Sequence, residues 1–523
     1  MTAALFDFEE RAAISVKGKA KPVPLYRLLG VNETPQLQRG IAGLNSEMVG
    51  RDEPFNFILK LIDNLKDNQG TVVALIAEAG LGKSRMLSEL KNTASYSYWI
   101  EGRGLSFAQN TSYGVARNML NNALNLPPNQ PTDLIGATLF EQLSVWDNTQ
   151  VQTLYPYLAR LSDIALDEET DMFLRAVTPD VMQERMRQAF GDFLILKSQS
   201  QPTVLVWEDL HWADTSSLQL IEYLFQIVHD RPLLLILSFR PQEGLAQDFH
   251  QRWSASKADY PVVMLQPLSE PDSQLLISNL LKIKNLPDKT RDTLLQKAEG
   301  NPFYLEELIR SLLDTGLLYW KGEEILLKEE LSDIHIPNTL QGVIEARIDR
   351  LHTEEKITLQ TASVIGRIFG RQVLEYLIEN QKKAIAINPA LINLQDRELI
   401  RQQILYEYIF KHAVTQDVNY NTLLLARRRE LHQYAAEAIE SLFPTQHEEL
   451  AHVLAWHYQR AQNHEKAVTF LVLAADKSRA TFSHQEAKNY YSDALKELDY
   501  LQDNRWQQRV TILEKLVVQE LNK

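Results

Sequence analysis

Short, almost continuous apolar runs recur along the first half of the chain. They occupy residues 71–77, 98–101, 203–207, 232–239 and 262–265. Runs of this length, rich in valine, leucine and isoleucine, are typical of strands that are buried on both faces of a parallel sheet. Between the runs, apolar residues recur at helical spacing, starting directly after the first run and its turn. The pattern predicts an α/β domain built on a parallel sheet.

The rest of the chain has a largely helical pattern. Residues 115–200, and most of those after 267, place aromatic and aliphatic side chains three or four positions apart. Near the end, the pieces W-H-Y-x-x-A…K-A and E-A…Y-x-x-A-L recur about thirty-four positions apart, the spacing of tetratricopeptide repeats. With about two such units, we expect the array to be cut short or completed by a partner protein.

The turn after the first run carries the first candidate chemistry. Gly80 and Gly82 can adopt conformations that other residues avoid, so successive N–H groups can converge on a phosphate at the start of a helix. In a loop of the type G-x-x-x-x-G-K-[ST], Lys83 reaches the β and γ phosphates and Ser84 binds magnesium. Ala77 replaces the first glycine, and we expect its methyl group to be tolerated. The stretch predicts an ATP or ADP site with Mg²⁺; a plain strand-turn-helix is the alternative.

Two carboxylates and an arginine stand at the ends of later strands. Glu208 and Asp209 follow the run at 203–207. One such carboxylate can hold magnesium while its neighbour orients and deprotonates the attacking water. We assign the metal to Glu208 and the water to Asp209, and the reverse assignment stays open. Arg240, after the run at 232–239, is a candidate for a charge-assisted contact with the γ-phosphate, or else an ordinary surface arginine.

The composition limits the classes of protein to which the chain can belong. With 523 residues, 45% of them hydrophobic and 23% charged, it is long enough for several globular domains. Its net charge of −14 argues against unspecific attraction to nucleic acids or anionic membranes. The absence of cysteine excludes disulfides and thiol chemistry and fits the cytoplasm. The sequence has no apolar run long enough to span a bilayer and no secretory signal.

Several motifs, in order along the chain, resemble the signal-transduction ATPases with numerous domains (STAND ATPases), including the AAA-type modules fused to class III adenylate and guanylate cyclases. They are Gly50-Arg51-Asp52 before a helix, the phosphate loop, E-D-L-H-W-x-D at 208–214, and G-N-P-F at 300–303. The resemblance covers about residues 45–523. It implies a P-loop ATPase domain followed by a helical lid and a winged-helix domain.

The resemblance also implies roles for individual residues. The segment with Gly50 and Arg51 would lie against the adenine, and Pro302 would pack on the same ring from the lid. Arg240 would act as a sensor of the γ-phosphate. His412, in the winged-helix domain, would touch the β-phosphate of ADP and hold the resting state. The alternatives are a plainly capped helix after Gly50-Arg51, ordinary capping at Pro302, and a buried, hydrogen-bonded histidine at 412.

Residues 1–30 alternate apolar and polar positions around Lys17-Gly18-Lys19, which predicts a hairpin. The hairpin resembles the last two strands of class III nucleotide cyclase domains, in which a lysine, here Lys17 or Lys19, contacts the substrate. The metal-binding aspartates of that family have no counterpart in this sequence, so we expect no cyclase activity from this chain alone. A chance hairpin that packs on the next domain is the alternative.

Together the patterns predict an α/β P-loop NTPase of the AAA or STAND type, followed by helical regions. The expected parts are a cyclase-like hairpin at 1–30, a linker at 31–45, the ATPase domain at 46–266, the lid at 267–335, the winged helix at 336–430 and the repeats at 431–523.

We expect a slow ATPase that works as a signalling switch and couples its nucleotide state to assembly or to an attached effector such as a cyclase. The expected partners are a protein bound by the repeats and, in the ATP state, a second copy of the chain; membranes and nucleic acids are not expected. The alternatives are the regulatory part of a split class III cyclase and a nucleotide-binding scaffold without turnover.

Overall fold

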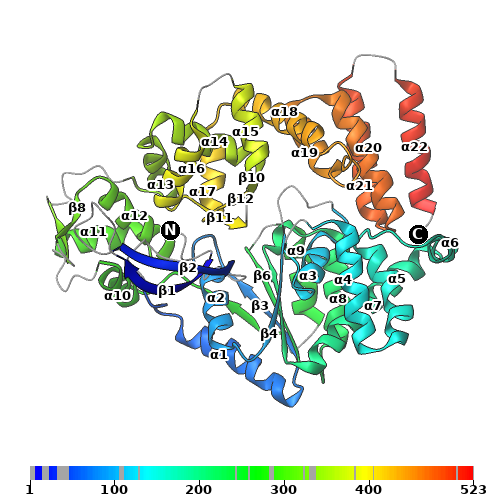
Figure 1. Cartoon of the computed structure of the whole chain (residues 1–523), viewed down its shortest axis with the longest axis horizontal. Helices are drawn as coiled ribbons and strands as arrows, with labels where there is room; N and C mark the ends of the chain where they lie inside the picture. Colours follow the sequence, from blue (N-terminus) through cyan, green and yellow to red (C-terminus); the bar gives the residue numbers. More distant parts are fainter. Residues whose placement is uncertain are drawn as a thin grey trace.

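The fold is described from a computed structural model of the chain. It covers residues 6–14, 23–31, 46–104, 111–127, 130–241, 244–256, 260–281, 288–321, 324–328, 337–381, 385–404, 406–501 and 505–521. The predicted turn at Lys17-Gly18-Lys19 and nearly all of the predicted linker lie outside the described residues. Figure 1 shows a sheet domain, with a smaller helical part at one side and a row of helices above it that ends at the C-terminus.

A five-stranded parallel sheet forms the centre of the first large domain, in the order β4-β5-β6-β3-β7. The strands are β3 (Thr71–Ile76), β4 (Tyr98–Arg103), β5 (Thr203–Glu208), β6 (Leu233–Phe239) and β7 (Val262–Met264). Of the three inner strands, β5 and β6 are buried along their whole length, and β3 is buried except at Thr71. At the edge of the sheet, two of the three residues of β7 are exposed. The predicted fold class is confirmed, and β4 runs two residues beyond the predicted end at 101.

Alternate residues of each strand enter two different cores, because side chains point to opposite faces of a sheet. In β3, Val73 and Leu75 pack with helices α1 (Asp52–Asp63) and α2 (Lys83–Thr93), while Val72 and Ala74 face the other side. That second core is covered by three further helices, which are α3 (Gly114–Ala123), α7 (Pro179–Ser200) and α8 (Thr215–Ile227). The continuous apolar runs in the sequence follow from this burial on both sides.

The helical segments predicted between residues 115 and 200, and after 267, are present. The first group adds α4 (Thr132–Trp146), α5 (Asn148–Leu161) and α6 (Glu168–Arg175) beside α7. The sheet domain also contains two short 3-10 helices, η2 (Asn64–Asp67) and η3 (Leu210–Trp212), and the helix α9 (Gly244–Ser256). The second group, in the part predicted to be the lid, comprises α10 (Glu270–Leu281), α11 (Asp288–Ala298), α12 (Pro302–Asp314) and the strand pair β8 (Leu318–Lys321) and β9 (Glu324–Leu327). Leucines of α10, α11 and α12 share one core.

The next region combines helices with a small antiparallel sheet of order β10-β12-β11. Its elements are α13 (Leu340–Asp349), α14 (Thr353–Ile365), β10 (Ile368–Gly370), α15 (Arg371–Asn380), α16 (Ile387–Asp396), β11 (Ile400–Ile404), β12 (Glu407–Phe410) and α17 (Ala413–Thr422). We refer to residues 337–424 as the latch region. Its assignment as a winged helix stays a prediction.

The last helices stack one after another on a shared apolar core, as helical repeats do. They are α18 (Leu425–Leu442), α19 (Ala451–Ala461), α20 (His464–Ala480), α21 (His484–Asp499) and α22 (Trp506–Leu521). The ends of α20 and α21 rest on the sheet domain, where Lys477 forms an ion pair with Asp163 and the side chain of Gln183 donates to the carbonyl of Phe482. The tetratricopeptide assignment stays a prediction.

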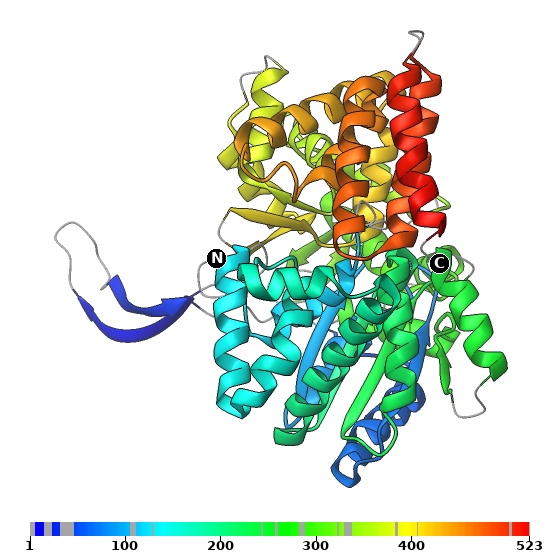
Figure 2. The same cartoon turned by 90° about the vertical axis from the view of Figure 1, so that its right-hand side faces the viewer.

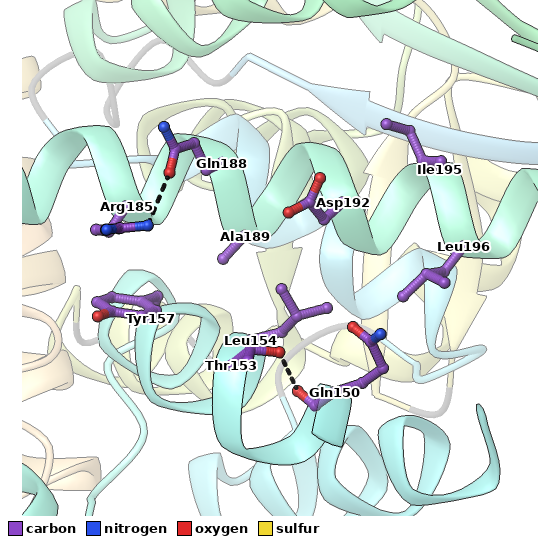
Figure 3. A pocket seen from close by; sticks show the side chains of 10 residues that line it. All are labelled: Gln150, Thr153, Leu154, Tyr157, Arg185, Gln188, Ala189, Asp192, Ile195 and Leu196. Carbon is purple, nitrogen blue, oxygen red and sulfur yellow. Dashed lines mark hydrogen bonds between the residues drawn. The ribbon is translucent and has the colours of Figure 1, made fainter. Parts of the chain in front are cut away.

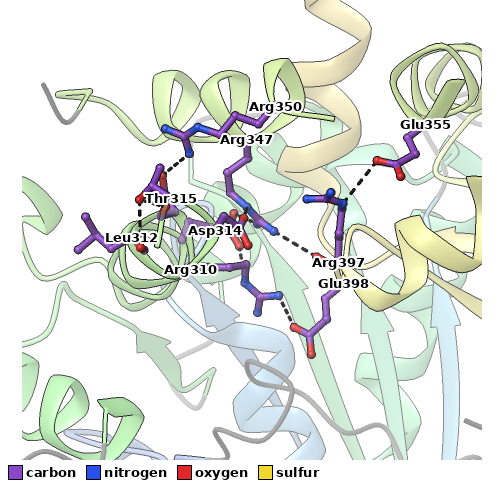
Figure 4. A network of polar contacts seen from close by, with 11 residues as sticks. Arg310, Leu312, Asp314, Thr315, Arg347, Arg350, Glu355, Arg397 and Glu398 are labelled. Atoms are coloured by element: carbon purple, nitrogen blue, oxygen red, sulfur yellow. Dashed lines mark hydrogen bonds and ion pairs between the residues drawn. The ribbon is translucent and has the colours of Figure 1, made fainter. Parts of the chain in front are cut away.

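A buried network of charges joins the lid to the latch region (Figure 4). Arg347 of α13 binds Glu307 and, at 3.1 Å, Asp314, both on α12. Arg310 of α12 binds Glu398 of the latch region. Glu398 also accepts a hydrogen bond from Lys411, in the same region, at 2.8 Å. Arg347 and Glu307 are almost completely buried, and breaking such a pair costs several kcal/mol because the other charge stays in the interior. The lid and the latch region are therefore held together as one body.

The predicted N-terminal hairpin is confirmed as an antiparallel pair of strands, β1 (Phe6–Ile14) and β2 (Val23–Val31), in which Ile14 pairs with Val23. It extends away from the body of the molecule (Figure 2). Its relation to cyclase domains stays a prediction. In the described part of the chain, no helix combines the length and the hydropathy that a bilayer crossing requires.

Candidate functional site

The loop between β3 and α2 has the backbone geometry of a phosphate-binding turn. Gly80 and Gly82, which precede the first residue of α2, take φ angles of 83° and 100°. Residues with a side chain are strained in this left-handed region, so both positions favour glycine. At Gly80 an added Cβ atom would also lie 2.8 Å from the amide oxygen of Asn301. The loop can therefore turn tightly and direct backbone N–H groups toward an anion.

Ala77, which stands where the motif has a glycine, is accommodated by the fold. It is almost completely buried and belongs to the same apolar core as Val73 and Leu75. Its φ lies in the ordinary negative range, and its N–H donates to the carbonyl of Phe239 at 3.4 Å. The backbone conformation at this position does not require glycine.

Lys83 and Ser84 open helix α2 at the mouth of the loop. The ammonium group of Lys83 donates to the carbonyl oxygens of Ala77 and, at 3.4 Å, of Glu78, so it lies over the loop backbone. Ser84 follows in the first turn and is half-buried. The structure places both residues at the positive end of the helix, where a phosphate group is stabilised.

The carboxylates of Glu208 and Asp209 lie at the carboxyl end of β5, beside two arginines. Arg103 pairs in register with Glu208 from the neighbouring strand β4, and its Nε donates to Oε2 of Glu208 at 3.1 Å. The same Nε lies 3.6 Å from Oδ2 of Asp209. Arg367, from the latch region, donates to that Oδ2 at 2.9 Å. Asp209 itself takes a left-handed conformation with φ 55°. Four charged groups from three parts of the chain therefore meet at this strand end.

The arginines control the protonation of Asp209. Burial alone would raise the pKa of this carboxyl group, but Arg103 and Arg367 outweigh burial and hold the pKa below its usual range. Asp209 is consequently ionised at neutral pH. It is an acceptor that could orient a water molecule, as expected from the sequence, but one of its oxygens is already engaged by a guanidinium group.

His211 and Arg240 extend the same cluster. Burial lowers the pKa of His211 to about 4; the charge of Asp209 opposes this shift, and the charges of Arg240 and Lys83 add to it. His211 is therefore neutral at pH 7. Arg240 directly follows the last residue of β6 and is half-buried. Because Phe239 pairs with Ile76 at the end of β3, the predicted sensor arginine lies at the same edge of the sheet as the phosphate loop.

Gly50 and Arg51, for which a contact with the adenine is predicted, lie beside the phosphate loop. Gly50 takes a φ of 64°, and an added Cβ atom would lie 2.6 Å from the carboxyl group of Asp272. The guanidinium group of Arg51 donates to the carbonyl of Gln266 at 2.7 Å and to that of Leu81 at 3.3 Å. Arg51 therefore ties the phosphate loop to the segment that leads into the lid.

The first turn of the lid helix α12 rests on the phosphate loop. The side chain of Asn301 caps α12 by accepting from the N–H of Tyr304 at 3.1 Å, and it donates to the carbonyl of Ala79 at 3.1 Å. Phe303 packs against the ring of His412, with centroids 4.2 Å apart, and its N–H donates to the carbonyl of Gly80 at 3.4 Å. The half-buried Pro302 lies between these two residues at the start of α12. The structure thus places Pro302 beside the loop and His412 against Phe303 of the same turn.

Sequence reasoning assigned no role to four residues that the structure places at the site. Two of them, Asn301 and Phe303, belong to the quoted G-N-P-F segment, where an asparagine before a proline already signals a helix cap. Arg103 lies two residues beyond the end of a predicted strand, much as Arg240 follows the strand before it, and this signal could have been used. Arg367 lies between a helix and a short strand, and nothing in its local sequence indicates a partner 158 positions away.

The predicted magnesium ligands, Ser84 and Glu208, fit the preference of this ion. Magnesium takes hard oxygen ligands and keeps several positions for phosphates and water, so one hydroxyl and one carboxylate suffice. Within the described residues no group of three or more His, Cys, Asp or Glu side chains forms another metal site. Oε2 of Glu208 binds Arg103, so an ion at this carboxylate would share it with the guanidinium group.

Asp214, the last residue of the acidic motif, links the site to the repeats. It caps α8 by accepting from the N–H and the hydroxyl of Ser217, and it accepts from the N–H groups of Tyr113 and Gly114 at 3.0 Å. Glu486 of α21 binds Ser216 of α8, accepting from its N–H at 2.8 Å and its hydroxyl at 2.9 Å. Two buried carboxylates therefore share the start of α8.

This carboxylate pair predicts a pH-dependent contact between the repeats and the sheet domain. Burial, together with the charge of Asp214, raises the pKa of Glu486 to about 7 from 4.5. The docked form binds the extra proton, so its stability is fully present below pH 4.5 and is lost as the pH rises through about 7. We expect the protection factors of α21, which correct for the intrinsic pH dependence of amide exchange, to fall between about pH 6 and 8. Replacing Glu486 by glutamine should remove this dependence, and a dependence that persists in Glu486→Gln would exclude Glu486 as its origin.

A separate pocket of about 300 Å³ lies between α5 and α7 (Figure 3). Leu154, Ala189 and Leu196 form its apolar part, and Arg185 and Asp192 stand on its rim. No residue that lines it belongs to the phosphate loop or to the ends of the sheet strands, so it is not part of the predicted nucleotide site.

Residues 47–236 match the AAA ATPase domain family. The match spans the phosphate loop, Glu208 and Asp209, and it confirms the AAA-type ATPase module predicted from the motifs.

Two kinds of relatives span most of the chain. An uncharacterized protein of Rhizobium meliloti (strain 1021) is 24% identical over 507 residues, which cover 94% of this chain and 46% of that protein. Adenylate cyclase type 10 of Mus musculus is 19% identical over 507 residues, covering 83% of this chain and 30% of the cyclase. The chain thus spans less than half the length of these relatives.

Two solved structures align with most of the chain at low sequence identity and low TM-score. A STAND protein with a tetratricopeptide repeat sensor from Pyrococcus horikoshii aligns over 92% of this chain and 70% of its own, with 12% identity and a TM-score of 0.42. A Walker-type ATPase of Pyrococcus abyssi aligns over 73% of this chain and 98% of its own, with 14% identity and a TM-score of 0.30.

Proposed function

We propose that this chain, whose residues 47–236 form an AAA ATPase domain, is a conformational switch that binds ATP and hydrolyses it slowly. The observation that carries the proposal is the meeting of three parts of the chain at the phosphate loop. The loop supplies Lys83, the lid rests on it through Asn301, and the latch region reaches it through His412, which packs on Phe303 of the lid. A nucleotide at the loop would therefore be held by all three parts.

The proposed resting state is a closed form with ADP. His412 and Pro302 would contact the nucleotide in this state, and exchange of ADP for ATP would favour an open form by population shift. Hydrolysis would then return the chain to the closed form, with Asp209 orienting the attacking water and Arg240 sensing the γ-phosphate. A magnesium ion at Ser84 and Glu208 would supply charge neutralisation at the phosphates. The product of each cycle is a change of shape.

The proposed output is contact with a protein partner through the repeats. Helix α22 leaves Trp506, Val510, Leu513 and Val517 exposed on its outer side. Exposed apolar side chains on one helix face favour an interaction surface. A second copy of the chain in the ATP state, or an attached effector, would use this surface.

A role as the regulatory part of a nucleotide cyclase is the second candidate. It is supported by the similarity to adenylate cyclase type 10 and by the N-terminal strand pair. Under this proposal the ATPase switch stays the same, and the effector is a cyclase catalytic domain. We expect no cyclase activity from this chain alone.

The switch proposal predicts that the purified protein carries ADP. Denaturing the fresh protein and separating the released nucleotides by chromatography should yield ADP in an amount close to that of the protein. An empty protein that also fails to bind added ATP would contradict the switch and favour a scaffold without turnover.

A second test uses the contact between His412 and Phe303. The variant His412→Ala removes one wall of the proposed closed site, so we expect ADP to dissociate about tenfold faster, corresponding to the loss of about 1.4 kcal/mol of contact. The rate is measured with a fluorescent ADP analogue. His229→Ala, a change of an exposed histidine beyond the end of α8, serves as the control. Equal rates of ADP dissociation in both variants would show that His412 does not contribute to holding the nucleotide.

A further inference from the structure

We propose that Arg367 is an inhibitory residue: while the latch region is docked, its guanidinium group occupies the carboxylate of Asp209 and suppresses ATP hydrolysis. The inference rests on the proposed function, because it concerns the residue that we expect to orient water. Arg367 donates from Nη1 to Oδ2 of Asp209 at 2.9 Å. Both side chains are only 22% exposed, so the contact is shielded from solvent.

The backbone around Arg367 fixes its position. Gly366, the residue before it, ends α14 with a φ of 147°, a conformation that favours glycine. The carbonyl of Arg367 accepts from the N–H of Phe410 at 2.9 Å, and the next residue, Ile368, pairs with Ile409. Since the chain is held on both sides, the long side chain is directed toward the sheet domain as long as β10 and β12 are in place.

The contact acts on the chemistry that Asp209 has to perform. A carboxylate that orients the attacking water and accepts its proton needs an unobstructed oxygen. Arg367 engages Oδ2 of Asp209 at 2.9 Å, and Nε of Arg103 lies 3.6 Å from the same atom. In the docked form Asp209 therefore has one oxygen fewer with which to hold a water molecule.

The two arginines at this carboxylate differ in their attachment. Arg103 belongs to β4, which is bonded along its length to β5, so it accompanies Asp209 in every state of the sheet. Arg367 comes from the latch region and can leave with it. The two guanidinium groups also repel one another, since burial and then the charge of Arg103 lower the pKa of Arg367. Arg367 is therefore the member of the cluster that a conformational change can remove.

The same movement would release the nucleotide contact. Strand β12 ends at Phe410, which binds the carbonyl of Arg367, and His412 follows two residues later. Displacing β10 and β12 would thus withdraw Arg367 from Asp209 and His412 from Phe303 together. Access to the nucleotide and the availability of Asp209 would be controlled by one element.

The first experiment compares the hydrolysis rate at saturating ATP in Arg367→Ala and in the wild type. We expect the variant to be about tenfold faster, because the oxygen that Arg367 occupies becomes available to the attacking water. Arg371→Ala is the matched control: this arginine lies in the same region, pairs with Glu375 of its own helix, and should leave the rate unchanged. A rate that falls in Arg367→Ala while ATP binding persists would overturn the proposal and make Arg367 a group that stabilises the transition state.

The second experiment measures docking without nucleotide, so it does not depend on the proposed function. Hydrogen exchange in β10 and β12 should increase in both Arg367→Ala and Asp209→Asn, since each loses the ion pair, and should stay at the wild-type level in Arg371→Ala. The charge-reversed double variant Asp209→Arg with Arg367→Asp should regain protection. Unchanged exchange in both single variants would show that the ion pair does not hold the latch region on the sheet domain, and it would overturn the proposal. A wild-type protein that binds no ATP would instead contradict the proposed function.

Discussion

Replacing Lys83 by alanine is expected to lower the affinity for ATP and ADP about a hundredfold or more. The ammonium group would donate charge-assisted hydrogen bonds to the phosphates, and losing bonds of this kind costs about 3 kcal/mol. It already lies over the loop, where the carbonyls of Ala77 and Glu78 accept from it. The backbone N–H groups and the helix end remain in the variant, so weak binding should persist. Isothermal titration calorimetry measures the effect.

The control for this change is Lys91→Ala. Lys91 lies on the same helix and forms an ion pair with Glu101, in which both side chains are more than 40% exposed. Such surface pairs contribute little, so the affinity should match that of the wild type. If Lys83→Ala bound ATP as tightly as Lys91→Ala, the assignment of the phosphate loop would be wrong.

Replacing Asp209 by asparagine should preserve ATP binding and reduce hydrolysis about a hundredfold or more, the usual contribution of a positioned general base. The amide keeps the size of the side chain but cannot take the proton of the attacking water. The release of Arg367 does not compensate, because the base itself is absent. Single-turnover hydrolysis with the pre-bound nucleotide separates this effect from binding.

The companion variant Glu208→Gln decides between the two carboxylates. If Glu208 holds the metal, its loss should weaken binding of magnesium and ATP together. If hydrolysis survived in Asp209→Asn and disappeared in Glu208→Gln, the assignments would be reversed: Glu208 would orient the water and Asp209 would hold the metal. Asp192→Asn, on α7 at the rim of the distant pocket, should behave as the wild type in both measurements.

The parts of the fold that depend on local patterns could be predicted from the sequence. Burial on both faces produces continuous apolar runs, so the strands around Val73 and Leu75 were recognisable. The phosphate loop was recognisable because a left-handed backbone selects glycine, at Gly80 and Gly82, for steric reasons. These features are dictated by neighbouring residues or by solvent exclusion, and neither requires knowledge of distant contacts.

The distant contacts could not be predicted, and they complete the candidate site. Arginines at the ends of strands are common, so Arg103 and Arg367 carry no mark of their carboxylate partners. Glu486 reads as a surface residue of an amphipathic helix, whereas it is buried against the start of α8. The expected position of Arg51 near the adenine stays a prediction, and the two backbone carbonyls that its guanidinium group bonds could not be foreseen from its local sequence. In each case the chain far away in sequence decides what the charge meets.

The buried charges between α12 and α13 set limits on how the chain can be divided for study. A fragment ending at the expected lid boundary, residue 335, would keep Glu307 and Arg310 but lose Arg347 and Glu398. A buried charge that loses its partner costs about 3–5 kcal/mol, a large share of the stability of a single domain. Such a fragment should aggregate or unfold, whereas one ending after the latch region keeps every member of the network. We therefore expect soluble expression of truncated forms that keep these ion pairs intact, and not of forms cut at the boundary expected from the sequence pattern.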